Sequence, residues 1–102
     1  MSQNKITRSA KGETCQVRLP GCSHNPEQTV WAHCNGSAAG KGIGMKAPAY
    51  LGAYACWNCH RIYDRQANPP EGWTRVDVEL AFAEGVWRSQ QILERKGLLV
   101  AA

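Results

Sequence analysis

Four of the five cysteines in this 102-residue chain occur as two pairs, and no other feature limits its fold as strongly. Cys56 and Cys59 have the spacing Cys-x-x-Cys, while six residues that end in a Pro-Gly turn separate Cys15 from Cys22. One tight turn can direct two thiolates at a metal ion, and zinc in structural sites takes four ligands in a tetrahedron. The sequence therefore predicts one structural Zn²⁺ held by Cys15, Cys22, Cys56 and Cys59, which joins two distant segments.

Other uses of the cysteines stay open. The thiols could be buried or redox-active, secretion would allow disulfides, and His24 could replace one cysteine as a ligand. The run Cys-x-x-Cys-His at 56–60 also matches the attachment signature of c-type haem, but haem would require export and would leave Cys15 and Cys22 unexplained. Cys34 has no partner at a suitable spacing, so we expect it to be a small buried residue.

The length and the N-terminal sequence indicate the class of protein. A chain of 102 residues fits one domain, and because so small a domain buries a modest fraction of its surface, a bound metal would stabilise it considerably. No apolar run approaches the roughly 20 residues that cross a bilayer, and the start, MSQNKITRSAKGE, lacks the apolar segment of a secretory signal. We therefore expect a cytoplasmic protein with no membrane partner, in a reducing compartment.

The expected fold class is α+β, with a single domain. Residues 1–12 form a basic N-terminal arm, either flexible or a short helix docked at one end, and residues 13–102 form the domain. Within the domain we expect a core of two strands and a helix over about residues 28–68, and a long C-terminal helix over about residues 75–96.

The core begins with the β-prone run Gln28–His33, which predicts a strand. A loop over residues 36–48, which holds four glycines and a proline, leads to a second expected strand at Tyr50–Ala55. A helix should begin at the Cys-x-x-Cys pair and end before the prolines at 69 and 70, because the residue before proline disfavours helical geometry.

The C-terminal helix has clear signals at both ends. Thr74 and Asp77 are placed as a capping box, and Gly97 is placed to end the helix. Trp87 and Ile92 are expected to flank the buried face. The residues expected on that face recur at steps of three or four: Val78, Phe82, Val86, Ser89 and Leu93.

Positive charge is concentrated in the part of the chain that holds every cysteine and histidine. Residues 1–65 carry eight basic and three acidic residues, a net charge of +5, whereas residues 66–102 carry four basic and five acidic residues, a net charge of −1. A positive face suits a polyanion such as nucleic acid, although an ordinary solvated surface has the same appearance. The basic residues expected to contact nucleic acid are Lys41, Lys46, Arg61 and Arg65.

A histidine and a carboxylate at helical spacing follow the second cysteine pair. His60 and Asp64 are four residues apart, so on a helix their Cβ atoms lie about 5–6 Å apart on one face and could hold a divalent cation. His33 ends the first expected strand, and in a hairpin facing the helix it could deprotonate a water near that cation. Each residue also has a structural interpretation: His33 could be a hydrogen-bonding histidine, His60 a ligand of the zinc, and Asp64 a member of a surface ion pair.

The order strand-His, glycine-bearing loop, strand and Cys-x-x-Cys-His helix resembles the HNH (ββα-metal) endonucleases. The runs CQVRLPGC, AHCNG, GKGIGMKAP and ACWNCHRIYDR more narrowly resemble small nucleases encoded by lambdoid phages and prophages, over about residues 8–68. The resemblance implies a zinc-stabilised, metal-dependent DNA endonuclease, with His33 as the general base and Mg²⁺ or Mn²⁺ held by His60 and Asp64. It implies DNA as a partner, together with a phage or host recombination or replication protein.

Two positions depart from the wider superfamily. Ala32 stands where many HNH enzymes have a further metal ligand before the base, and Ala49 and its neighbours offer no asparagine to orient the base. The alternative function is therefore a non-catalytic zinc module that binds nucleic acid or a protein.

Overall fold

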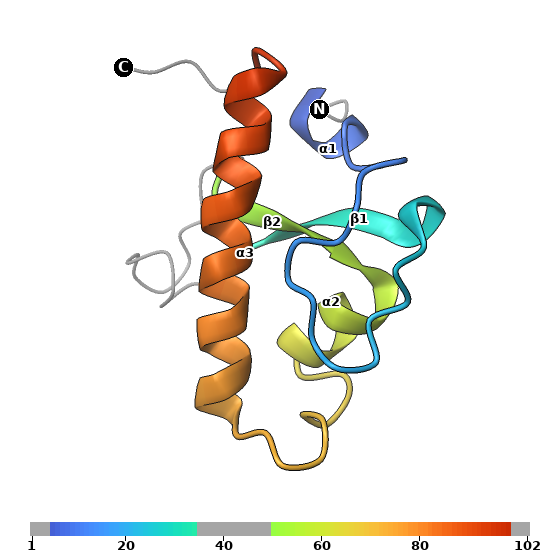
Figure 1. The fold of residues 1–102 in the computed structure, drawn as a ribbon, viewed down its shortest axis with the longest axis vertical. Coiled ribbons are helices and arrows are strands. Elements are labelled where there is room, and N and C mark those ends of the chain that lie inside the picture. The colour runs from blue at the N-terminus through green and yellow to red at the C-terminus, as the bar shows by residue number, and fades with distance from the viewer. Residues whose placement is uncertain (1–4, 35–49, 99–102) are drawn as a thin grey trace.

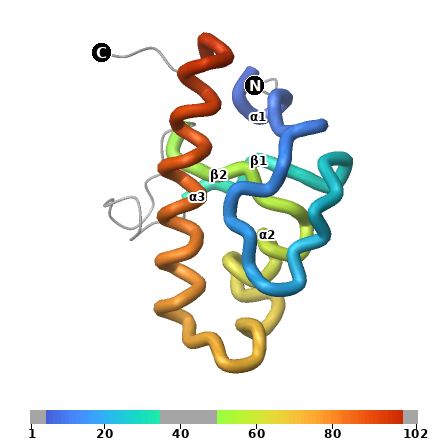
Figure 2. Tube along the Cα trace, in the orientation of Figure 1, coloured from blue at the N-terminus to red at the C-terminus, as the bar shows by residue number. Residues whose placement is uncertain are grey.

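The computed structural model describes residues 5–34 and 50–98, and its elements make up an α+β chain with a long C-terminal helix (Figure 1). The elements in chain order are α1 Lys5–Arg8, the 3-10 helix η1 Pro26–Gln28, β1 Thr29–His33, β2 Gly52–Cys56, α2 Trp57–Tyr63 and α3 Arg75–Arg95. The two strands form a hairpin, α2 follows β2 directly, and α3 runs along the molecule beside both (Figures 1 and 2). The glycine-rich loop expected over residues 36–48 lies outside the described residues.

The hairpin is covered on both faces. Its strands are antiparallel, with Trp31 opposite Tyr54 and Ala32 opposite Ala53. Because side chains alternate along a strand, the alanines lie on one face, where they pack with Ile62 of α2 and the N-terminal half of α3. The two aromatic rings lie on the other face, edge to face at 5.0 Å, and pack against the C-terminal half of α3.

Both ends of α3 have the predicted caps. The Thr74 hydroxyl accepts from the Asp77 amide at 3.1 Å, and the Asp77 carboxylate accepts from the Thr74 amide at 2.8 Å, which completes a capping box. At the C-terminal end Gly97 has a φ of 74°. The amides of Gly97 and Leu98 donate to carbonyls of the last turn at 3.0 and 2.9 Å, the pattern of a Schellman motif.

The buried face of α3 differs from the expected one in part. It consists of Val78, Phe82, Gly85, Ser89, Ile92 and Leu93. Val86 is half-buried, and the expectation that Trp87 flanks the buried face was wrong, because its side chain is 68% exposed. At 100° per residue, Trp87 lies on the solvent face with Val76 and Leu80, which are also exposed.

The segment between α1 and η1 packs against α3 and the hairpin. Gln16 adds a backbone contact to β2, since its amide donates to the Tyr54 carbonyl at 2.7 Å. A Cβ atom on Gly85 would lie 3.0 Å from Val17 Cγ2 and 3.1 Å from the Gln16 carbonyl oxygen, so the absence of a side chain allows this approach.

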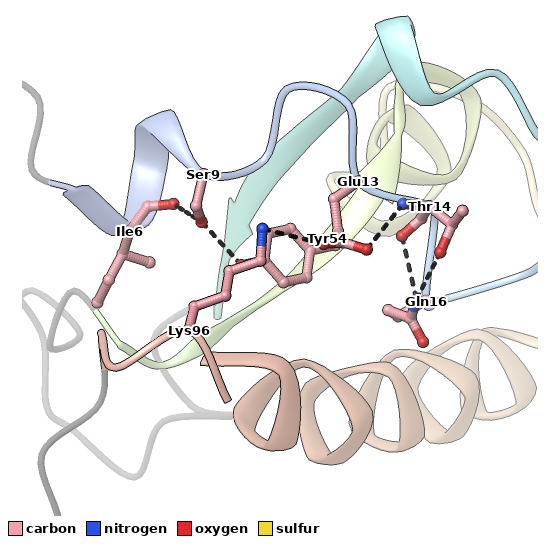
Figure 3. Close-up of polar contacts among 7 residues, drawn as sticks. All are labelled: Ile6, Ser9, Glu13, Thr14, Gln16, Tyr54 and Lys96. Carbon is pink, nitrogen blue, oxygen red and sulfur yellow. Dashed lines mark hydrogen bonds and ion pairs between the residues drawn. The ribbon is translucent and has the colours of Figure 1, made fainter. Parts of the chain in front are cut away.

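Within the expected basic arm, residues 5–8 form α1, and the turn after it docks on the hairpin. Ala10 is buried, and the Ser9 hydroxyl lies 2.7 Å from the Tyr54 hydroxyl (Figure 3). Among the described helices, none combines the length and the hydropathy needed to cross a bilayer.

Candidate functional site

The four cysteines of the two pairs meet at one point, called here the cysteine cluster. The Sγ atoms of Cys15, Cys22, Cys56 and Cys59 all lie within 4.8 Å of one another. Those of Cys22 and Cys56 are 3.6 Å apart, and all four thiols are free. In a tetrahedral zinc–thiolate centre with bonds of about 2.3 Å, neighbouring sulfur atoms lie about 3.8 Å apart. The cysteine cluster therefore fits a metal ion such as zinc.

The local backbone directs donors at the sulfur atoms. The amide of Arg18 donates to Cys15 Sγ at 3.5 Å, and the amide of Cys59 donates to Cys56 Sγ at 3.4 Å. Cys56 is also the N-cap residue of α2, so the helix begins within the cysteine cluster. Amides that donate to thiolates stabilise their negative charge and orient them around an ion.

Proton affinities in the cysteine cluster are uneven when no cation is bound. The Cys59 thiol donates to Cys15 and, against the opposing effect of burial, lowers the pKa of Cys15 to about 4. The same hydrogen bond, together with burial, raises the pKa of Cys59. Burial raises the pKa of Cys22 to about 12; burial also raises the pKa of Cys56, but amide donors outweigh it and leave that pKa below its ordinary value. A divalent cation supplies the charge that lets all four thiols ionise.

The remaining His and Cys candidates lie outside the cysteine cluster. His24 is exposed, has a φ of 56°, and is not among the four clustered ligands. Cys34 is half-buried and lines an apolar pocket of about 170 Å³ with Phe82 and Val86. Burial and the nearby Glu79 carboxylate raise the pKa of Cys34. The clustered set is thus the four-cysteine set that the spacing predicted.

His60 and Asp64 lie side by side on α2 and are called here the His–Asp pair. His60 Nε2 is 2.9 Å from Asp64 Oδ2, and the two side chains are 34% and 30% exposed. Cys59, Ile62 and Tyr63 form the opposite, buried face of α2. The helix therefore presents the nitrogen and the carboxylate together toward solvent, where a cation could reach both.

His33 is the last residue of β1, opposite Gly52, and its side chain is exposed. Strand alternation puts it on the face of Trp31, whereas Ala32 is on the face that packs with α2. Within the described residues the His33 side chain makes no hydrogen bond or ion pair. Alternation therefore places His33 on the face of β1 opposite to the one that packs with α2.

Two of the four basic residues expected to contact nucleic acid are next to the His–Asp pair. The Arg61 guanidinium lies 4.6 Å from the centre of the Trp57 ring, which is 57% exposed. Arg65 follows the C-cap residue of α2, is exposed and has a φ of 65°. Lys41 and Lys46 lie outside the described residues.

Sequence reasoning missed Arg75, which ties α2 to α3. Its guanidinium donates to the carbonyl of Ile62 at 2.7 Å and to that of Tyr63, lies 5.7 Å from the Tyr63 ring, and pairs with Glu79 at 2.8 Å. These bonds fix the C-terminal turn of α2, and so the place of the His–Asp pair. A charged residue in the first turn of a long helix gives no such signal in the sequence.

Comparison with known proteins places the chain in a family. The family model described as "Putative nuclease YbcO" matches residues 4–98. The chain is 34% identical over 97 residues to "Putative nuclease YbcO" of Escherichia coli (strain K12) and, to the same extent, to "Putative nuclease ybcO" of Enterobacteria phage 82; each match covers 94% of this chain and 97% of the relative.

A solved structure has the same fold. It is described as "Structure of a putative bacteriophage protein from Escherichia coli str. K-12 substr. MG1655", and it superposes with a TM-score of 0.71 at 32% sequence identity. The match covers 89% of this chain and 98% of that one. With sequence and structure in agreement over nearly their whole lengths, this chain belongs to the YbcO family.

Proposed function

We propose that this chain is a metal-dependent DNA endonuclease of the HNH (ββα-metal) type, with a structural Zn²⁺ in the cysteine cluster. The observation that carries the proposal is the 2.9 Å contact of His60 with Asp64 on a helix whose N-cap is a cysteine of the cluster. A metal bound there would fix the start of α2 and, with it, the direction of the His–Asp pair. The nuclease names of the relatives agree with this reaction class.

The His–Asp pair would hold Mg²⁺ or Mn²⁺, which offsets charge on the scissile phosphate and stabilises the leaving oxygen. His60 offers a nitrogen and Asp64 an oxygen, and their partial exposure leaves room for phosphate oxygens and waters as further ligands. His33 would act as the general base that accepts a proton from the attacking water. Its exposure at the end of β1 leaves its imidazole accessible for that role.

The charge around α2 supports DNA as the substrate. Arg61 and Arg65 flank the His–Asp pair in sequence and would contact phosphates, while the exposed Trp57 ring offers a surface for stacking. Lys41 and Lys46, in the glycine-rich segment, would add further backbone contacts.

The second candidate is a non-catalytic zinc module that binds DNA or a phage or host recombination or replication protein. Two observations favour it. Ala32, which directly precedes His33, has no ligand atom in its side chain and is fully buried. Strand alternation also turns His33 toward the Trp31 face and away from the face that packs with α2.

Nicking of supercoiled plasmid in Mg²⁺ or Mn²⁺ separates the two candidates. We expect the wild-type protein to nick, and His33→Ala to lower the rate at least about a hundredfold, the usual size of a general acid–base contribution. His60→Ala and Asp64→Asn remove ligands of the proposed cation and should also lower the rate strongly. His24→Asn is the matched control, because it removes an exposed histidine at a positive φ that asparagine tolerates.

The outcomes differ in what they exclude. Equal nicking by the wild type and all three site variants would mean contamination. DNA binding without nicking would favour the non-catalytic module. Loss of nicking in His60→Ala and Asp64→Asn, with His33→Ala fully active, would keep the cation site and remove His33 as the base.

A further inference from the structure

Three arginines, one from the N-terminal segment and two from α3, line one polar pocket. The pocket has a volume of about 290 Å³ and lies between the N-terminal segment and the C-terminal half of α3. Its lining residues are Glu13, Thr14, Gln16, Arg18, Arg88, Gln91, Ile92 and Arg95, and this set is called here the arginine pocket. None of these residues belongs to the cysteine cluster or to the His–Asp pair.

The floor of the arginine pocket is fixed by packing. Arg88 donates from Nε and Nη2 to the carbonyl oxygen of Gln16, at 3.2 and 2.7 Å. One turn earlier on α3, Gly85 allows this same backbone to approach the helix closely. Arg88 is therefore held at the pocket. Its other terminal nitrogen, Nη1, makes no hydrogen bond with the described residues.

Arg18 is positioned by two further contacts. Its guanidinium donates to Gln16 Oε1 at 3.2 Å, and its amide donates to Cys15 Sγ in the cysteine cluster. The Gln16 side chain is itself buried and held by the Thr14 hydroxyl at 2.9 Å (Figure 3). Arg18 has a φ of 60°, a backbone conformation that is costly for a residue with a long side chain.

The one carboxylate in the pocket is neutralised from outside it. Glu13 pairs with Lys96 at 3.1 Å (Figure 3). Arg18, Arg88 and Arg95 therefore face the cavity with no carboxylate of the lining left unpaired. Three guanidinium groups around a polar cavity are suited to a phosphate, because the planar fork of arginine matches two phosphate oxygens.

We propose that the arginine pocket binds a phosphate of a nucleic-acid backbone. The proposal rests on the proposed DNA substrate, and it adds a contact that uses α3 and the turn of the first cysteine pair. Because the Arg18 amide donates to Cys15 Sγ, this phosphate contact would lie next to the cysteine cluster.

The test compares the salt dependence of binding to a 20-bp duplex, measured by fluorescence anisotropy without added Mg²⁺ or Mn²⁺. The variant is Arg18→Asn combined with Arg95→Gln, since asparagine tolerates a positive φ and Arg95 is exposed. Losing two phosphate contacts should flatten the slope of log K against log salt by about 1.8. Between 50 and 200 mM salt, the wild type should then lose about twelvefold more affinity than the variant.

The matched control is Arg8→Gln combined with Lys11→Gln, which removes two positive charges outside the pocket. It should change the slope by less than half as much. Zinc content should match the wild type for both variants, and neither variant should melt below the wild type. An unchanged slope in the pocket variant, or an equal change in the control, would overturn the proposal. If the pocket variant lost the binding of pyrophosphate but bound DNA as the wild type does, the pocket would be a site for free phosphates. That result would also overturn the proposal.

Failure of this proposal can be told from failure of the proposed nuclease function. If His60→Ala abolishes nicking while the pocket variant keeps the wild-type slope, the pocket fails and the catalytic proposal stands. If the wild type never nicks but the pocket variant flattens the slope, the catalytic proposal fails and the pocket stands.

Discussion

Asp64 is placed where helix energetics disfavour a carboxylate. It is the C-cap residue of α2, and the negative end of a helix dipole repels an anion there by a few tenths of a kcal/mol. The contact with His60 offsets about as much, because a partly exposed pair at this helical spacing contributes about 0.3–0.5 kcal/mol. Stability thus gives no reason for a carboxylate at this position, whereas the proposed cation site would.

Asp64→Asn should therefore separate stability from cation binding. We expect the free energy of unfolding in urea to change by less than about 0.5 kcal/mol, because the lost ion pair and the relieved dipole repulsion nearly cancel. Mn²⁺ affinity, measured by electron paramagnetic resonance, should fall at least about tenfold, since a neutral amide replaces a charged ligand. A variant that kept wild-type Mn²⁺ affinity would exclude Asp64 as a ligand.

Ser89 is a buried hydroxyl that joins α3 to β2. It accepts from the Tyr54 amide at 3.0 Å, donates to the Gly85 carbonyl at 2.6 Å, and has no exposed surface. Ser89→Ala would leave a buried amide without a partner and should lower the free energy of unfolding by about 1–3 kcal/mol. Chemical denaturation would measure this, with Ser23→Ala at an exposed position as the control, expected to change stability by less than about 0.5 kcal/mol.

At the scale of the element, α2 ends in a Schellman motif built on an arginine. The amide of Arg65 donates to the Ile62 carbonyl and that of Gln66 to the Arg61 carbonyl, at 3.1 and 2.8 Å. Glycine is the usual residue at this left-handed position. An arginine there accepts backbone strain beside the His–Asp pair, which a role in binding phosphate would explain.

Arg65→Gly should stabilise the fold and weaken DNA binding. Removal of the strain is expected to raise the free energy of unfolding by about 0.5–1 kcal/mol, less any entropy that glycine adds to the unfolded chain. DNA affinity at 50 mM salt should fall, and the salt slope should flatten by about 0.9. Arg65→Asn is the control that keeps the left-handed turn, and it should show the same loss of affinity. Unchanged DNA binding in both variants would leave Arg65 without a functional role.

Most elements could be predicted because they depend on local pattern. The caps of α3 at Thr74 and Gly97 are encoded within a few residues, and so is the strand that ends at His33. The exposure of Trp87 and the burial of Gly85 could not be predicted. They depend on where residues 16–17 approach α3, which is a tertiary contact without a signal in helical periodicity.

At the scale of the whole molecule, the cysteine cluster joins the segment before η1 to the junction of β2 and α2. Residues between Cys15 and Cys22, such as Val17, pack against α3. We expect this packing to depend on the link that the cysteine cluster makes between the two segments. Binding of structural zinc contributes about 10–16 kcal/mol in small domains, which equals or exceeds the total stability of an average protein.

Removal of the metal should therefore unfold the protein. A strong chelator, or Cys56→Ser, is expected to abolish the cooperative thermal transition seen by circular dichroism. Elemental analysis should find one zinc per wild-type chain, and the same for Cys34→Ser, the matched control outside the cluster. A chelated protein that still melted cooperatively near the wild-type temperature would show that the core is sufficient without the metal.

The candidate site was predictable to different degrees. The four cysteines and the His–Asp pair could be predicted from residue spacing, because the partners in each pair are close in sequence. The two cysteine pairs could be joined because one metal ion needs four ligands. The arginine pocket combines Arg18 with residues some 70 positions later, and the place of His33 relative to the His–Asp pair depends on which face of the hairpin α2 covers. Neither can be obtained from residue spacing.

Residues 35–49 divide both the hairpin and the cysteine cluster in sequence. Cys15, Cys22 and β1 precede them, and β2, Cys56 and Cys59 follow them. A chain cut once by a protease between residues 35 and 49 would give two fragments, each with half of the thiolates and one strand of the sheet. A metal ion held by the cysteine cluster would bridge the two fragments, and its removal would take away that link. The fold thus has the layout of a split protein whose reassembly a metal ion would control.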